Sequence, residues 1–280
     1  ELMLDNTDRN RTSPFAFTGN RFEFRAVGSS ANCSNAVSTL NTIVADQLMI
    51  FKEAIDKRIA DGVPVMQAIL DETRETYRAA KNICFDGNGY SDDWKREAER
   101  RGLDCETSPP KCYDVLTDKK TVELYKRTGV MTEAELVARR ETFCDIYSKK
   151  IEIEARILAD LTENHILPIA IQYESRLLEN VSRMKEIFTG KEYKDLASGE
   201  ISMIKNIAEH LSEVRGLAVE MEEVCDKAND SGTESEKANM YHDEVVPYLD
   251  KIRVLIDDLE MIVDDEMWPL PKYRELLFIR

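Results

Sequence analysis

The chain has 280 residues, of which 42% are hydrophobic and 33% are charged, so it can bury a core and is not a disordered tail. Its formal net charge is −16. A surface this acidic repels phosphate backbones and anionic lipid headgroups, which makes nucleic acids and membranes poor candidate partners. Glycine (11 residues) and aromatic residues (8%) are scarce, and this favours helices over a β-sandwich or barrel.

The acidity is concentrated near the C-terminal end, where 16 acidic residues stand against four basic ones between Glu220 and Glu266. No signal peptide and no apolar run of 18 residues is found, so we expect a soluble cytoplasmic protein. No cysteine spacing matches a C-x-x-C zinc pair, and we expect the six cysteines to be buried free thiols. Because the chain begins with Glu1 and its opening resembles the middle of a domain, we also expect a fragment.

Residues 9–27 form the main β-rich stretch of the sequence. Apolar residues at 22, 24 and 26 alternate there with Arg21, Glu23 and Arg25, a period of two that sends three charged side chains to one face. Charged side chains on a strand are costly unless their face meets water, ions or a ligand. The pattern leaves two interpretations open, a half-exposed edge strand and the wall of a site.

The sequence after Ser30 predicts helices. Apolar residues spaced three and four apart predict one helix from Val37 to Ile59, ended by Gly62 and Pro64, and a second from Met66 to Ala80. Shorter helices are expected at 91–101 and 118–127, with a loop around Pro109-Pro110. Thr132 and Glu135 form a capping box that starts a long helix, which Pro168 should kink or break.

Two heptad patterns follow, from Ile204 to Cys225 and from Tyr241 to Ile262. The polar link 229–235 between them is too short for anything but an antiparallel return. These segments predict an antiparallel helical bundle over residues 130–266. The apolar tail, Trp268-Pro-Leu-Pro-Lys-Tyr with Leu276, Leu277 and Phe278, is expected to pack onto the body of the protein.

Three short motifs occur in order near the start: Asn10-Arg-Thr-Ser, Arg21-Phe-Glu-Phe-Arg and Ser30-Ala-Asn. Together they resemble the closing motif of the glutamine synthetase catalytic domain. The Asn-Arg-Thr-Ser-Pro-Phe-Ala-Phe segment, the helical extension and the Trp-Pro-Leu-Pro-Lys-Tyr end are similar to the type III branch. The expected fold is therefore mainly α: a short β segment from the end of that catalytic sheet, then helices and the antiparallel bundle.

The resemblance implies an ATP-dependent glutamate–ammonia ligase that makes glutamine through γ-glutamyl phosphate. It places Glu23 at a position that binds Mg²⁺ or Mn²⁺, for which a carboxylate oxygen is a suitable ligand. Arg25 matches the arginine that contacts glutamate and the transferred phosphate, and Arg11 the one that reaches nucleotide phosphate and substrate. The commoner forms carry another ATP-contacting arginine where this chain has Ala16, and Arg21 is the candidate replacement.

The resemblance also implies a homo-oligomer of two stacked hexameric rings, with active sites between neighbouring subunits. We expect residues 1–62 to form the C-terminal end of the catalytic domain and residues 63–129 to form a helical connector. Residues 130–280 are expected to form a helical C-terminal extension for assembly or regulation. The remaining metal-binding glutamates are not found in residues 1–30, so the isolated chain should be inactive. The alternative is a stand-alone helical interaction module with a degenerate synthetase-like strand.

Other residues that could carry chemistry have simpler interpretations. The lone histidines His165, His210 and His242 lie on predicted helices, where surface or capping roles outweigh metal binding. The acidic run at 264–266 lacks the spacing of a calcium loop and is typical of a solvated helix end.

Overall fold

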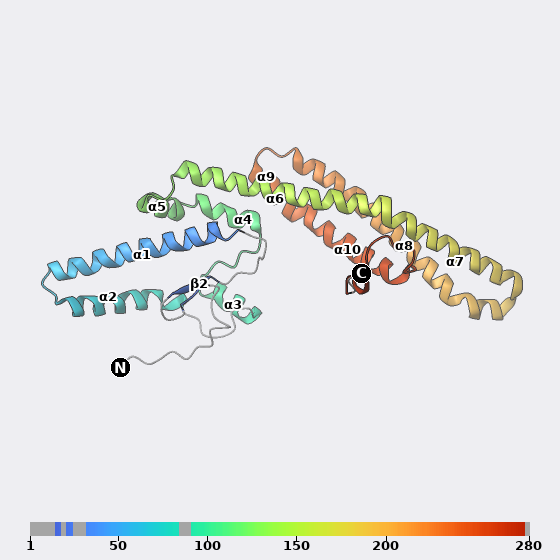
Figure 1. Cartoon of the computed structure of the whole chain (residues 1–280), viewed down its shortest axis with the longest axis horizontal. Helices are drawn as coiled ribbons and strands as arrows, with labels where there is room; N and C mark the ends of the chain where they lie inside the picture. The colour runs from blue at the N-terminus through green and yellow to red at the C-terminus, as the bar shows by residue number, and fades with distance from the viewer. Residues whose placement is uncertain (1–14, 18–20, 25–31, 84–90, 278–280) are drawn as a thin grey trace. The chain divides into compact units, whose positions relative to one another are not determined.

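The computed structural model describes residues 15–17, 21–24, 32–83 and 91–277 (Figure 1). The chain is mainly helical, as the sequence predicts, and it divides into two compact units. Unit 1 comprises residues 1–107 and 114–139, and unit 2 comprises residues 108–113 and 140–280. The predicted division at residues 62 and 129 into three functional parts stays a prediction.

Unit 1 contains a short hairpin followed by helices. Its elements are β1 (Phe15–Phe17), β2 (Phe22–Phe24), α1 (Ser34–Ala60), α2 (Val65–Ala80), η2 (Lys81–Ile83), α3 (Asp92–Arg100), η3 (Val115–Thr117), α5 (Lys119–Thr128) and the first residues of α6 (Glu133–Leu161). The predicted stop between α1 and α2 is confirmed, because Gly62 takes the left-handed conformation with φ of 90° and Pro64 caps α2. The predicted capping box is confirmed too: the Thr132 N–H donates to Glu135 Oε2 at 2.7 Å.

Polar side chains hold the helices of unit 1 together. Arg127 of α5 donates two hydrogen bonds of 2.7 Å to the two carboxylate oxygens of Asp46 on α1. Two turns earlier on α1, the Thr39 and Tyr125 hydroxyls lie 2.9 Å apart. These long-range contacts fix α5 against α1, and the bidentate geometry of the Arg127–Asp46 pair also fixes its orientation.

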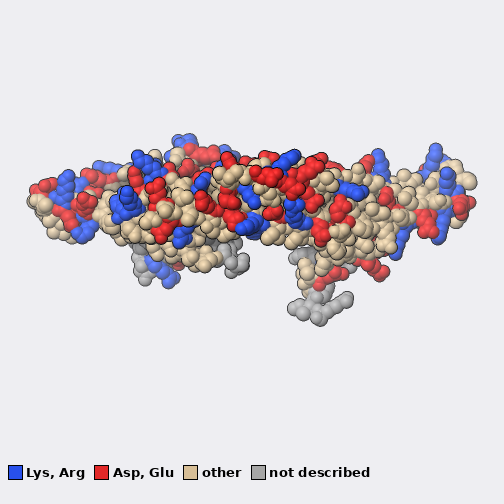
Figure 2. Space-filling view, turned by 90° about the horizontal axis from the view of Figure 1, so that it is seen from above, with Lys and Arg blue, Asp and Glu red and all other residues tan. Residues whose placement is uncertain are grey.

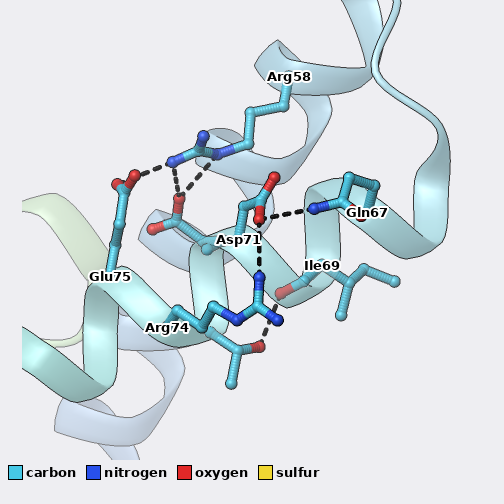
Figure 3. A network of polar contacts seen from close by, with 8 residues as sticks. Arg58, Gln67, Ile69, Asp71, Arg74 and Glu75 are labelled. Atoms are coloured by element: carbon cyan, nitrogen blue, oxygen red, sulfur yellow. Dashed lines mark hydrogen bonds and ion pairs between the residues drawn. The ribbon is translucent and has the colours of Figure 1, made fainter.

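The contact between α1 and α2 is polar as well. Arg58 of α1 donates to Glu72 at 3.1 Å and to Glu75 at 2.8 Å, both on α2 (Figure 3). On α2 itself, Gln67 and Arg74 both donate to Asp71 Oδ1, at 2.8 and 3.4 Å. Glu72 and Glu75 thus lie on the side of α2 that faces α1.

Unit 2 is built from three long helical segments. Its elements are α4 (Pro109–Asp114), most of α6, the π-helical turn η4 (Thr162–Ile166), α7 (Leu167–Ile187), α8 (Gly190–Asn229), α9 (Glu234–Met240), the π-helical turn η5 (Tyr241–Val245), α10 (Val246–Ile262) and α11 (Tyr273–Leu276). The predicted antiparallel return is confirmed, because Tyr241 donates to Asn229 at 3.1 Å and Tyr248 to Glu220 at 3.3 Å, pairing α9–α10 with the reversed α8.

Helix α8 lies at the centre of the core of unit 2. Its apolar seam, predicted from the heptad spacing, is buried from Ile207 through Val214 to Cys225. Side chains of the α6–α7 segment and of the α9–α10 segment complete the core on either side of that seam. Along the α6 side, Arg156 donates to Asp226 at 2.8 Å and Asn229 donates to Glu152 at 2.7 Å.

Proline breaks neither the α6–α7 segment nor the α9–α10 segment. Pro168 and Pro247 each follow a π-helical turn, in which the Leu167 N–H donates to the Thr162 carbonyl and the Val246 N–H to the Tyr241 carbonyl. A proline has no N–H and its ring clashes with the preceding turn, and a widened turn relieves both problems without ending the helix. The predicted disturbance at Pro168 is therefore a local π turn in a continuous helical segment.

Other sequence expectations need correction. Pro109 and Pro110 do not lie in a loop but begin α4, because the first positions of a helix need no N–H donor. Cys144 and Cys225 are buried as expected, whereas Cys33, Cys105 and Cys112 are exposed. Cys84 lies outside the described residues.

The C-terminal tail packs onto unit 2 only in part. Trp268 is 7% exposed and belongs to the core, and Met267 and Leu270 pack against it. Lys272 lies over the Trp268 ring and donates to the Glu260 carbonyl at 2.7 Å. The expectation that the rest of the tail docks is wrong for Leu276 and Leu277, which are 69% and 62% exposed, and Phe278 lies outside the described residues.

Acidic and basic side chains are interspersed over the face shown in Figure 2, without a broad basic area on that face. Such a face gives no extended site for a phosphate backbone. Among the described helices, none combines the length and apolar character required to cross a bilayer.

Truncation of Met221 to alanine should lower the free energy of unfolding by about 2–5 kcal/mol, because this fully buried side chain fills the core beside α8. Urea titration followed by far-ultraviolet circular dichroism measures the change. Met261→Ala is the matched control, since Met261 is 85% exposed and its truncation should alter stability by less than about 0.5 kcal/mol. Equal effects of the two substitutions would contradict the assigned core.

The Asp46–Arg127 pair should make the attachment of α5 dependent on pH. Hydrogen bonds from Arg127 lower the pKa of Asp46 below its ordinary value. The contribution of the pair is therefore present above the unfolded pKa, about 3.9, and is lost as the pH falls through the lower folded pKa. We expect Asp46→Asn to accelerate amide exchange in α5 several-fold at neutral pH, measured by mass spectrometry.

At a pH below the folded pKa of Asp46, the substituted and unsubstituted chains should exchange alike in α5. Asp56→Asn removes another α1 carboxylate, whose partner is the exposed Lys52, and should leave α5 exchange unchanged at every pH. A pH-independent effect of Asp46→Asn would show that ionisation of Asp46 is not the cause.

Candidate functional site

The residues singled out by the sequence lie on the β1–β2 hairpin. The two strands are antiparallel, with Phe15 opposite Phe24, Ala16 opposite Glu23 and Phe17 opposite Phe22. This register places Arg21 and Glu23 on β2 or at its edge, two positions apart. Because side chains two positions apart on a strand point to the same side, the hairpin supplies the common charged face that the alternation predicts.

Arg21 and Glu23 also contact each other directly. An Arg21 guanidinium nitrogen lies 3.5 Å from Glu23 Oε1, and the two side chains are 73% and 35% exposed. An ion pair this open is worth little as a stabilising contact. The pair places a carboxylate and a guanidinium group side by side, and such groups are suited to binding a cation and an anion respectively.

The other two predicted site residues, Arg11 and Arg25, lie outside the described residues. Their gathering with Arg21 and Glu23 in one cleft therefore stays a prediction. Ala16 lies directly opposite Glu23 in the register of the hairpin. Opposite positions of an antiparallel pair share a face, so an arginine at position 16 would reach the same space as Arg21.

The Glu23 carboxylate is a suitable type of ligand for a divalent cation, but one carboxylate supplies too few ligands. Its carboxylate oxygens are the hard ligands that Mg²⁺ and Mn²⁺ prefer, yet Mg²⁺ requires about six oxygen ligands, several of them often water. Within the described ranges, no group of three or more histidine, cysteine, aspartate or glutamate side chains could hold a metal ion. A complete metal site would need carboxylates from outside the described residues.

The bundle of unit 2 offers a different kind of surface. One groove of about 560 Å³ lies between α6 and α10 and is lined mainly by aliphatic residues, including Ile157, Leu161 and Leu249. A second groove, of about 650 Å³, lies between α7 and α8 around Ile171 and Val219. Both are apolar grooves between helices, and neither is lined by a histidine or a cysteine.

Structural roles account for Cys225, His210 and His242 of unit 2. Burial raises the pKa of the Cys225 thiol to about 11, so this thiol stays protonated and unreactive at neutral pH. His242 Nδ1 lies 2.8 Å from the Tyr147 hydroxyl, and His210 contacts the Asn206 carbonyl at 2.8 Å and Asp258 at 3.4 Å. His165 is exposed on η4.

Comparison with known proteins identifies the family. A family model described as the glutamine synthetase C-terminal domain matches residues 68–185. The whole chain is 47% identical to a glutamine synthetase of Bacteroides fragilis and 33% identical to a type-3 glutamine synthetase of Dictyostelium discoideum. The chain belongs to the glutamine synthetase family.

A third relative, the glutamine synthetase of Butyrivibrio fibrisolvens, is 28% identical over 98% of the chain. The chain spans 38% of the length of each of these three relatives. The similarity of the whole chain to part of the type-3 protein supports the branch indicated by the sequence motifs. The matched model begins after the hairpin, so the match to it rests on helical residues of both units rather than on the candidate site.

Proposed function

We propose that this glutamine synthetase chain is part of an ATP-dependent ligase that joins glutamate and ammonia. A γ-carboxylate oxygen of glutamate attacks the terminal phosphorus of ATP, and ADP leaves. Ammonia then attacks the acyl carbon of γ-glutamyl phosphate and displaces inorganic phosphate. The observation that carries this proposal is the similarity of all 280 residues to part of relatives named glutamine synthetase.

The hairpin supports a specific division of roles. Phosphoryl transfer requires positioning and charge stabilisation more than covalent help from the protein. Glu23 would hold Mg²⁺ or Mn²⁺ through its carboxylate, and such a cation would supply positive charge for the transferred group. Arg25 contacts glutamate and the phosphoryl group, Arg11 contacts both substrate and nucleotide phosphate, and Arg21 contacts ATP.

The complete protein would work as a cytoplasmic homo-oligomer of stacked hexameric rings. Unit 2 would serve assembly or regulation, since its long helices and two apolar grooves provide surface for packing. Residues 1–280 alone would be inactive, because Glu23 must be joined by other metal-binding carboxylates.

The alternative is a stand-alone helical interaction module. The same two grooves favour it, because exposed aliphatic side chains between helices suit a docking helix. The upstream reading frame separates the two proposals: metal-binding glutamates preceding residue 1 support the ligase, and an initiator methionine shortly before Glu1 supports the module.

Glu23→Ala in the complete protein should lower the turnover number for glutamine formation by about a hundredfold or more, because a ligand of the charge-stabilising cation is lost. The assay follows glutamine formation at saturating Mg²⁺. Glu186→Ala, at an exposed glutamate of α7, is the control and should leave turnover unchanged. Wild-type turnover of Glu23→Ala would refute the metal-binding role.

Arg21→Ala should raise the KM for ATP about tenfold or more, while the KM for glutamate changes little, because a charged hydrogen bond to a phosphate is lost. The double substitution Ala16→Arg with Arg21→Ala should restore ATP affinity, since position 16 lies opposite Glu23 on the same face. Steady-state kinetics with ATP as the varied substrate measures both effects. An unchanged KM for ATP in Arg21→Ala would exclude Arg21 from the nucleotide site.

A further inference from the structure

Helix α1 meets its neighbours through a stripe of polar residues. Four of them, spaced four, three and four positions apart, lie on one face of the helix: Asn35, Thr39, Thr42 and Asp46. The two buried residues of α1 both belong to this stripe, Thr42 at 5% and Asp46 at 7% exposure. The Thr39 hydroxyl lies 2.9 Å from that of Tyr125 on α5, whose side chain is buried. The buried face of α1 is therefore polar.

An arginine binds each end of the stripe. At the start of α1, Arg139 of α6 donates to Asn35 Oδ1 at 3.0 Å. About three turns later, Arg127 of α5 donates two hydrogen bonds of 2.7 Å to Asp46, one to each carboxylate oxygen. A bidentate contact fixes the orientation of its two partners as well as their distance. The two arginines together thus define both the position and the direction of α1 relative to α5 and the start of α6.

The residues that bind the stripe belong to the family's C-terminal domain. The family model matches residues 68–185, a range that includes Tyr125, Arg127 and Arg139. Helix α1 ends at Ala60, before that range begins. The matched domain therefore contacts, through specific polar groups, the helix that precedes it in the chain.

The start of α1 is directly connected to the candidate site. The Ser30-Ala-Asn motif ends at Asn32, and Asn32 Oδ1 accepts a hydrogen bond of 2.9 Å from the N–H of Ser34, the first residue of α1. Glu23 precedes Asn32 by only nine positions. A short stretch of chain thus joins the candidate metal ligand to the helical turn that Arg139 binds.

Polar contacts of this kind suit positioning better than stabilisation. The Arg139–Asn35 pair is exposed on both sides, and such contacts add little to the free energy of folding. Even for the buried Asp46, pairing offsets the loss of hydration more than it adds a net gain. What the stripe does provide is a defined orientation of α1, which is what a site at the end of that helix requires.

We propose that Arg127 and Arg139 are positioning residues of the ligase: by holding α1, they orient the segment that carries Glu23. This inference rests on the proposed function, because the reaction that they serve is the proposed one. Neither arginine contacts substrate; each acts through α1. The C-terminal domain then contributes to the reaction itself as well as to assembly or regulation.

Steady-state kinetics of glutamine formation by the complete protein tests the proposal. Arg127→Gln and Asp46→Asn should each lower kcat about tenfold and change the KM for ATP and glutamate less than about threefold, because misalignment harms the transition state more than substrate binding. The double substitution should be no slower than the slower single one, since the same contact is lost only once. Arg176→Ala, at an exposed arginine of α7, is the control and should leave kcat unchanged. Wild-type kcat in both single variants, or multiplied losses in the double variant, would overturn the proposal.

Two milder substitutions separate positioning from stability. Arg127→Lys keeps the charge but cannot make the bidentate contact, so kcat should stay several-fold reduced while the thermal midpoint remains within about 2 °C of the unsubstituted protein. Arg139→Ala removes an exposed contact and should likewise lower kcat several-fold at an unchanged thermal midpoint. Full kcat in Arg127→Lys would contradict the requirement for orientation, and full kcat in Arg139→Ala would remove Arg139 from the proposed role.

Amide exchange gives a readout that does not depend on ligase activity. In the complete protein, Arg127→Gln should accelerate exchange of the peptide that spans β1 and β2, residues 15–24, about threefold or more, because α1 is held less firmly. This response in a protein that forms no glutamine would reject the proposed function and keep the link from Arg127 to the hairpin. Glutamine formation with no response of either kcat or exchange would reject the inference alone.

Discussion

The apolar seam of α8 is the constraint on which the folded part of this protein depends. A helix of this length cannot bury a continuous row of side chains such as Ile207, Val214 and Met221 by itself, and it needs neighbours along the seam. The α6–α7 segment and the α9–α10 segment meet that need. Each must remain helical past a proline to do so, and the π turns before Pro168 and Pro247 allow it.

Unit 1 follows another principle of construction. Its helices are joined by directional polar contacts, Asp46 with Arg127 and Arg58 with Glu72, rather than by a contiguous apolar core. Polar contacts specify orientation well, but their net contribution to stability is small because charged groups lose hydration when they pair. The consequence is a unit whose polar contacts specify its geometry, while several apolar side chains of α1 and α2 are exposed among the described residues.

The candidate site lies in unit 1, whose helices are joined by polar contacts. Arg21 and Glu23 share one face of a hairpin of only two short strands, where charge can meet a cation or a phosphate. The proposed ligase function would give that face a chemical role. The contrast between the two units also matches their proposed tasks: chemistry requires parts gathered from several segments, whereas a packing extension can fold around its own core.

The sequence by itself determined the features that repeat at short range. Heptad spacing predicted α8 and its antiparallel partner, the Thr132–Glu135 box predicted the start of α6, and alternation at 21 and 23 predicted a shared charged face. These features follow from residues within a few positions of each other. The ordered motifs around the hairpin likewise led to the family, because a motif is a local pattern.

Tertiary structure alone decided which face of a helix meets a neighbour. The stripe from Met66 to Tyr77 predicted an amphipathic α2, yet its carboxylates turn toward Arg58, fourteen or more positions away, and its apolar side stays outside. The pairing of Asp46 with Arg127 joins residues 81 positions apart, and no local sequence pattern predicts it. Helical periodicity fixes which side chains share a face, but the packing partner determines whether that face is buried.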